Sequence, residues 1–303
     1  MYIVSFFQYL LRKSNFPVIF YLILNTLIVS ALLGGSFSTN PLIAMLIGLA
    51  AYLVSLAVAL SPLGEYIVRK QTKCSEIKDE SVRNFIEPIF REVLGKARQV
   101  NPEIPDDVEL YMNDSEDVNA FATGRKTVCV TRGMLQQDPE MIRATLGHEM
   151  GHLAHHDTDL ILVVTVGNMI VNAFFVMVRI GGKIFKTISL MVAMFSRDRD
   201  NVAAALIMHV SAIITDFILV KLMSLWTKLG TMLVMKSSRS QEYEADEFSF
   251  NLGYGEALCG LLDSFPAAHD KGLFANLMSS HPDKNERIKK LVALGVSYTP
   301  TGI

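Results

Sequence analysis

Two long segments near the start of the chain carry no charged side chain. Residues 17–33 (PVIFYLILNTLIVSALL) and 41–60 (PLIAMLIGLAAYLVSLAVAL) are each close to the ~20 apolar residues that cross a bilayer as one helix. Half of all residues are hydrophobic and only 19% are charged, which is more apolar than soluble domains usually are. We therefore predict a transmembrane hairpin within residues 1–62, with the lipid bilayer as a partner.

Basic residues flank this hairpin on both sides. Arg12 and Lys13 precede it, Arg69, Lys70 and Lys73 follow it, and the loop between the two segments has no charge. Because basic residues tend to stay on the cytoplasmic side, we expect the N-terminus and the chain after the hairpin to begin there. A signal peptide is the alternative for the first segment. No small-residue cleavage site follows cleanly and a second apolar segment comes at once, which favours an uncleaved hairpin.

The net charge and the cysteines indicate which binding partners and which cellular compartment are expected. The formal net charge is -2 and no basic stripe is present, so nucleic acid is not a predicted partner. The three cysteines, Cys74, Cys129 and Cys259, are far apart and form no C-x-x-C pair. This pattern predicts free, packed thiols in a reducing compartment.

From residue 75 the composition is that of a soluble domain. Residues 75–100 place apolar side chains at helical spacing, and 108–112 and 127–131 read as short strands. Asp138 then stands where a helix cap would, with Pro139 at the first helical position. We predict a fold that is mainly α with a small β-sheet, in which transmembrane helices accompany a globular domain.

The stretch LGHEMGHLAHHD lies on this last helix and holds four of the chain's seven histidines. His148 and His152 are four residues apart, so both imidazoles face one side and can share a zinc ion at about 2.0 Å. Glu149 projects beside them toward a bound water. A solvated amphipathic helix is the alternative, but Gly147 and Gly151 each cost about 1 kcal/mol relative to Ala and indicate close packing. The spacing predicts a zinc hydrolase.

The other two histidines of the stretch, His155 and His156, are interpreted differently. On a continuing helix they lie seven and eight residues from His148 and cannot converge on the same ion. We interpret them as structural or solvated. We also expect the helix to run on through them, directly into the apolar segment that begins at residue 160.

Two histidines do not complete a catalytic zinc site, so a third protein ligand is required. The best candidate region is SRSQEYEADEFSFNLG, residues 238–253, which reads as a second helix. Glu242 and Asp246 stand four apart on it. One carboxylate is expected to bind the metal while the other accepts a hydrogen bond from a ligand imidazole and fixes its tautomer.

At this point the motifs resemble a known family. HEMGH, QEYEAD followed by NLGY, VNAFATG at 118–124 and HPDKNERI at 281–288 are similar to the HtpX-type integral-membrane zinc metalloproteases, relatives of the CAAX prenyl proteases. The resemblance covers most of the chain and the motifs occur in the family's order. It implies a zincin-like protease domain in the cytoplasm and one Zn²⁺ per chain. By position it implies that the zinc ligands are His148, His152 and Glu242, that Glu149 is the catalytic base and that Asp246 supports a ligand histidine.

The same resemblance points to substrate contacts. His281 is a candidate to stabilise the oxyanion, with Arg287 near it; the alternative is a helix start before Pro282 and a structural ion pair for Arg287. Asn119 begins an NAFA segment that the family associates with a strand edge, where extended peptides bind. The alternative is an internal strand with Asn119 in a turn, which the residues alone slightly favour.

A hydrophobic insertion separates the two zinc motifs. Residues 160–178 and 202–220 are each long enough to span a bilayer. The basic residues between them oppose this, because they would lie outside, and an interfacial arrangement is the alternative. Spanning is favoured because both zinc helices must return to the cytoplasmic side. The predicted parts are a transmembrane hairpin (1–62), a first protease segment (63–158), the insertion (159–236) and a second protease segment (237–303).

These expectations combine into one functional prediction. The chain is expected to be a multi-pass enzyme of the plasma (inner) membrane that hydrolyses peptide bonds with a zinc-activated water. The resemblance implies stress-linked quality control of misfolded or damaged membrane proteins. A dedicated maturation or CAAX-like processing protease is the alternative. A non-catalytic, zinc-stabilised membrane scaffold is a third reading, against which Glu149 argues, because a structural zinc site needs no base. Neither the motifs nor the resemblance specifies an oligomeric state.

Overall fold

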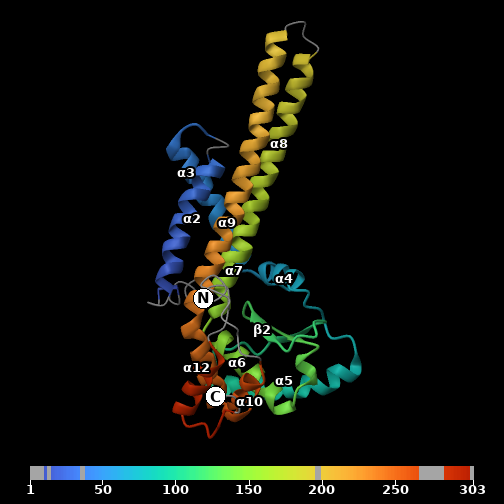
Figure 1. The fold of residues 1–303 in the computed structure, drawn as a ribbon, viewed down its shortest axis with the longest axis vertical. Helices are drawn as coiled ribbons and strands as arrows, with labels where there is room; N and C mark the ends of the chain where they lie inside the picture. Colours follow the sequence, from blue (N-terminus) through green and yellow to red (C-terminus); the bar gives the residue numbers. More distant parts are fainter. Residues whose placement is uncertain (1–9, 12–14, 35–37, 195–198, 266–282, 301–303) are drawn as a thin grey trace. The chain divides into compact units, whose positions relative to one another are not determined.

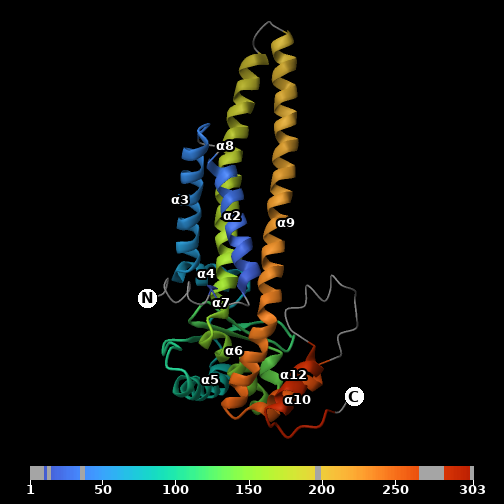
Figure 2. The same cartoon turned by 90° about the vertical axis from the view of Figure 1, so that its left-hand side faces the viewer.

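The computed structural model describes residues 10–11, 15–34, 38–194, 199–265 and 283–300. The chain forms two compact units (Figures 1 and 2). One consists of residues 21–57 and 164–231 and is helical. The other consists of residues 1–20, 58–163 and 232–303, and combines helices with a sheet. Each unit is described by itself below.

The helical unit is built from the apolar segments. It contains most of α2 (Phe16–Gly34), α3 (Pro41–Ala59), α8 (Asn168–Met194) and the first part of the long helix α9 (Arg199–Asn251). Among the described residues, α3 alone is long and apolar enough to cross a membrane, and α2 meets the apolar criterion over Phe16–Ile28, which is shorter. The predicted segments 160–178 and 202–220 are helical, but four spans stay a prediction.

One buried asparagine connects all four helices of this unit. Asn25 on α2 donates from Nδ2 to Tyr52 Oη on α3 at 3.0 Å and to Asn168 Oδ1 on α8 at 2.8 Å. Trp226 on α9 donates to Asn25 Oδ1 at 2.9 Å. Asn168 also donates to Tyr21 Oη at 2.7 Å. Polar side chains buried in an apolar bundle bond to one another because apolar neighbours offer them no hydrogen bonds, and they thereby fix which helix faces meet.

The second unit holds a three-stranded sheet with helices packed on it. Its strands are β1 (Glu109–Asn113), β2 (Ala120–Thr123) and β3 (Thr127–Thr131), in the order β1-β3-β2. β1 runs parallel to β3 and β2 antiparallel to it, so β2 lies at an edge of the sheet. A mostly helical fold with a small sheet is therefore confirmed. The helices of the unit are α4 (Pro62–Gln71), α5 (Glu80–Val100), η2 (Met134–Gln136), α6 (Pro139–Ala154), α7 (Asp157–Leu162), the end of α9, α10 (Gly255–Ser264) and α12 (Lys284–Ala293); the π-helical turn η3 (Val163–Gly167) begins at the unit's boundary.

The core of this unit forms around α5. Its fully buried side chains Ile86, Phe90, Val93 and Ala97 recur at helical spacing and therefore line one face. They pack in one cluster with apolar residues of the sheet and of α6. Asp79 begins the helix, because its side chain accepts the backbone N–H of Ser81 at 2.8 Å. The apolar face of α5 thus provides the support on which the sheet and α6 rest.

The helix α6 begins as the sequence predicts but ends earlier. Asp138 caps it by accepting the Glu140 N–H at 2.8 Å, and Pro139 takes the first position. The predicted continuation of the helix is wrong, because α6 ends at Ala154. His156 adopts a left-handed conformation with φ 58°, which breaks the helical hydrogen bonds, and α7 starts anew at Asp157. The break turns the chain where a straight helix was expected.

Core packing around α5 gives the first prediction. Phe90→Ala is expected to lower the free energy of unfolding by roughly 3–5 kcal/mol, because it removes a fully buried ring and leaves a cavity. Phe85→Ala on the same helix is the matched control, since Phe85 is 41% exposed. Chemical denaturation of the detergent-purified protein measures both. Equal losses for the two variants would contradict the assignment of this core.

Candidate active site

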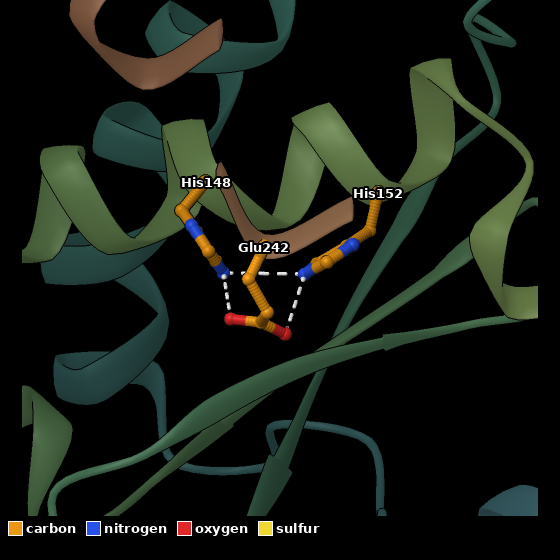
Figure 3. A group of neighbouring side chains, drawn as sticks. All are labelled: His148, His152 and Glu242. Carbon is orange, nitrogen blue, oxygen red and sulfur yellow. Dashed lines mark hydrogen bonds and ion pairs between the residues drawn. The ribbon is translucent and has the colours of Figure 1, made fainter. Parts of the chain in front are cut away.

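Three side chains from two helices meet at one point. His148 and His152 project from α6 on the same side, and Glu242 reaches them from α9 (Figure 3). The two Nε2 atoms are 3.2 Å apart. Glu242 Oε2 lies 3.5 Å from Nε2 of His148, and Oε1 lies 3.5 Å from Nε2 of His152. The structure thus brings together the two histidines and one of the two carboxylates that the sequence offered as ligands.

This spacing fits a tetrahedral metal ion. Ligands at 2.0–2.1 Å from a tetrahedral zinc lie about 3.3 Å from one another. The separation of the two Nε2 atoms, 3.2 Å, is close to that value, and each nitrogen lies 3.5 Å from a different oxygen of Glu242. Two imidazoles and one carboxylate are also a donor set of catalytic zinc sites, in which the fourth position is left to water or substrate. The residues present therefore fit a catalytic zinc ion.

Asp246 supports the first histidine. Its Oδ1 lies 2.8 Å from His148 Nδ1, and Arg287 on α12 holds the same carboxylate at 2.6 and 2.8 Å. Burial by itself would raise the pKa of Asp246, but the hydrogen bonds from Arg287 and His148 lower it. An ionised carboxylate on Nδ1 keeps the proton on that nitrogen and turns the Nε2 lone pair toward Glu242. The sequence offered Arg287 either as a residue near the substrate or as part of a structural ion pair. The structure contains an ion pair, with Asp246, and this pair lies at the site.

Sequence reasoning missed the equivalent partner of the second histidine. Asp157 Oδ2 lies 2.9 Å from His152 Nδ1, and Asp157 is buried. The expected straight helix would have placed this residue on another face. An acidic D-T-D run directly after the histidines, typical of the first turn of a new helix, is the signal that indicates a break here.

The charges around the two imidazoles favour a cation. Burial would lower the pKa of His148, but hydrogen bonds to Asp246 and Glu242 raise it. Burial would also lower the pKa of His152, but Asp157 and Glu242 raise it well above its ordinary value. The carboxylates therefore stabilise positive charge where the two rings meet. A divalent metal supplies that charge without protons.

Glu149 is buried on α6 and faces the edge of the sheet. Its Oε2 accepts the backbone N–H of Ala122 in β2 at 2.7 Å. Since Asn119 O accepts the Thr131 N–H of β3 at 3.0 Å, odd-numbered residues of this segment bond inward to the sheet. The backbone groups of Ala120 and Ala122 therefore point outward, toward Glu149. The internal position that the residues alone favoured for this strand is wrong.

A cavity of about 460 Å³ adjoins the two site residues His148 and Glu149. Asn119 lies at its edge and is exposed, and Arg287 contributes to its wall. Its apolar wall comes mainly from α10, through Leu258, Leu261 and Leu262. The cavity thus combines an apolar wall with polar groups at the end that meets the site.

The remaining sequence candidates fall elsewhere. His281 lies outside the described residues. His155 and His156 are half-buried and are not part of the cluster; the ring of His155 packs edge-on against Phe248. Their interpretation as structural residues agrees with this packing.

Close packing of α6 against α9 places Glu242 beside the two histidines. A Cβ added to Gly151 on α6 would lie 2.8 Å from Cα of Ala245 on α9, and one on Gly147 would lie 3.0 Å from Ser249 Oγ. Ser249 Oγ also donates to Ala144 O on α6 at 2.8 Å. The two glycines therefore allow the helix backbones to approach closely, which is the close packing that the sequence indicated.

Comparison with known proteins agrees with this geometry. The model of peptidase family M48 matches residues 86–294. Protease HtpX of Shewanella pealeana is 27% identical over 294 residues, covering 88% of this chain and 93% of that protein. Protease HtpX homolog of Lactobacillus helveticus is 29% identical over 318 residues, covering 92% and 96%. These matches confirm the resemblance that the motifs indicated. The chain belongs to peptidase family M48 and is a metalloprotease.

Proposed function

We propose that this metalloprotease is a zinc-dependent endopeptidase embedded in a membrane, with His148, His152 and Glu242 as the zinc ligands and Glu149 as the catalytic base. One observation carries the proposal. The two histidine Nε2 atoms lie 3.2 Å apart, and each is 3.5 Å from one oxygen of Glu242, on the helix α6 that also carries Glu149. Ligands, base and peptide-binding edge are thus within reach of one another.

The chemistry follows from the roles of these groups. A zinc ion held by the three ligands would supply a Lewis acid that polarises a carbonyl and lowers the pKa of a water molecule. Glu149 accepts the proton of the attacking water and then passes it to the leaving amine. The Ala122 N–H orients the Glu149 carboxylate for this transfer. Asp246, held by Arg287, keeps His148 in the tautomer that binds metal through Nε2.

An extended peptide is the substrate shape that the edge strand supports. Main-chain groups of such a peptide pair with the outward backbone groups of Ala120 and with the carbonyl of Ala122, as in strand addition, while the Ala122 N–H stays on Glu149. The carbonyl to be cleaved then lies beside Glu149, and a neighbouring apolar side chain enters the cavity of about 460 Å³. We propose that Asn119 contacts this peptide and that His281 stabilises the oxyanion.

The membrane location and the substrate class are further parts of the proposal. We propose that residues 1–62 and 159–236 anchor the enzyme in the plasma membrane, with the protease segments 63–158 and 237–303 in the cytoplasm. The apolar helix α3 and the basic residues that flank the hairpin support this arrangement. Misfolded or damaged membrane proteins are the proposed substrates.

Dedicated processing of one peptide, including a CAAX-like maturation step, would use the same catalytic residues. Substrate profiling of membranes with the active enzyme separates the two functions. Quality control predicts many cleaved membrane proteins without one fixed sequence, and more of them after heat or misfolding stress. A single product with a constant cleavage site would favour the dedicated protease.

Removing the base tests the mechanism. Glu149→Gln is expected to lower kcat/KM on casein or a membrane substrate by roughly 10²- to 10⁴-fold, because the amide cannot accept the proton. Bound zinc, measured by elemental analysis, should remain at the wild-type level. Glu140→Gln, an exposed position on the same helix, is the matched control and should keep its activity. Undiminished proteolysis by Glu149→Gln would overturn the mechanism.

Removing the third ligand tests the metal site. Glu242→Ala is expected to weaken zinc binding by more than the roughly 10- to 100-fold that loss of an outer hydrogen-bond partner costs, because a direct ligand is lost. Chelator competition measures the zinc dissociation constant. Glu247→Ala, exposed on the same helix, serves as the control. Wild-type affinity in Glu242→Ala would require a different ligand.

A further inference from the structure

We propose that the three residues Asp157, Thr158 and Asp159, at the start of α7, form a positioning clamp for the active site. The inference rests on the proposed function and adds positioning residues to it. Asp157 orients the zinc ligand His152. Thr158 and Asp159 hold the turn between β2 and β3, and through it the strand that orients Glu149. All three residues are buried, with exposures of 5%, 4% and 0%.

The helix break at His156 is what makes the first contact available. Asp157 follows His152 by five residues, which on an unbroken helix would place the two side chains about 140° apart. The left-handed conformation of His156, with φ 58°, turns the chain back instead. As a result Asp157 Oδ2 lies 2.9 Å from His152 Nδ1. The left-handed conformation is uncommon for residues other than glycine, and His156 adopts it where the site needs the turn.

The contact has a defined chemical effect. A carboxylate that accepts the Nδ1–H of an imidazole fixes the tautomer, so that the Nε2 lone pair is available to a metal. It also prevents the ring from rotating. His148 receives the same support from Asp246, at 2.8 Å. Each ligand histidine therefore has its own carboxylate, one from α9 and one from α7.

Thr158 and Asp159 act on a different part of the site. Thr158 Oγ1 donates to the carbonyl oxygen of Gly124, and Asp159 Oδ2 accepts from Arg125 at 2.7 Å and 3.1 Å. Gly124 and Arg125 lie in the turn that joins β2 to β3. The carboxylate of this ion pair is fully buried, and Arg125 is partly buried with a side-chain exposure of 12%. A buried, hydrogen-bonded ion pair fixes geometry firmly because neither charge can move to water without losing its partner.

The turn is also held from its other side, by α4. Glu65 accepts the backbone N–H of Arg125 at 3.0 Å and the hydroxyl of Thr127 at 3.3 Å. The edge strand β2 therefore ends in a turn that is bound by both α4 and α7. The Ala122 N–H of β2 donates to Glu149. A displacement of this turn would therefore shift β2 and, with it, the catalytic base.

Two variants with different expected effects test the clamp on the full-length, detergent-purified protein. Asp157→Asn is expected to raise the zinc dissociation constant about 10- to 100-fold and to change the visible spectrum of the cobalt-substituted protein, because the orientation of His152 is lost. Thr158→Val keeps the side-chain shape but removes the bond to Gly124. It is expected to raise KM for a peptide substrate roughly fivefold while zinc affinity stays within twofold of wild type.

Stability measurements separate positioning from a merely structural role. If Asp157 only stabilised the fold, Asp157→Asn would lower the melting temperature of the metal-free protein and leave the cobalt spectrum unchanged, which would overturn the inference. Asp157→Glu retains a carboxylate and is expected to bind zinc more tightly than Asp157→Asn. Equal effects of Asp157→Asn and Thr158→Val on zinc affinity would also contradict the two separate roles.

The wild-type protein distinguishes this inference from the proposed function. Zinc binding and cleavage by the wild type, together with normal zinc affinity in Asp157→Asn, would overturn the clamp alone. A wild type that neither binds zinc nor cleaves peptides would overturn the proposed function, and the clamp with it.

Discussion

The close contact between α6 and the C-terminal part of α9 is the interaction on which the site depends. Gly147 and Gly151 leave room for the α9 backbone at Ala245 and Ser249, so that Glu242 reaches two histidines that lie far from it in the sequence. Any Cβ at Gly151 would separate the helices by a few tenths of an ångström or more. Metal ligands tolerate little displacement, because coordination distances vary by only about 0.2 Å. The packing of these two helices therefore determines how close Glu242 lies to the two histidines.

The site buries several acidic side chains, whose negative charge has to be balanced by nearby positive groups. Four carboxylates, those of Glu149, Asp157, Glu242 and Asp246, are buried around the two imidazoles, with Arg287 as the cation that holds Asp246. Burying so many like charges without a partner is costly. The raised pKa of both histidines expresses the same tendency, since the carboxylates favour positive charge between them. A metal ion between the two imidazoles would balance this negative charge, and Asp157 and Asp246 each form a hydrogen bond with the Nδ1 atom of one ring.

Much of the site could be predicted from local patterns. The spacing of His148 and His152 determines their common face as soon as the segment is helical, and Asp138 with Pro139 predicts where that helix starts. Strands at 108–112 and 127–131 were predicted within one residue, because β-branched and aromatic residues between turn signals are a local feature. The role of β2 as an edge could not be predicted from local patterns and was indicated only by the family resemblance, since it depends on which strands pair and in what order. The end of α6 at Ala154 was also missed, because a helix that continues through the acidic D-T-D run was expected, whereas this run starts a new helix.

The sequence by itself therefore determined the residue types, their spacing along two helices and the apolar segments, because helical periodicity and hydrophobicity are properties of consecutive residues. Only the tertiary structure separates the positions of Glu242 and Asp246, since both stand on one helix and differ in which atom of His148 they approach. It alone also joined Asp157 to His152 and Ala122 to Glu149. These contacts arise from a chain reversal and from strand pairing, and neither follows from a periodic pattern.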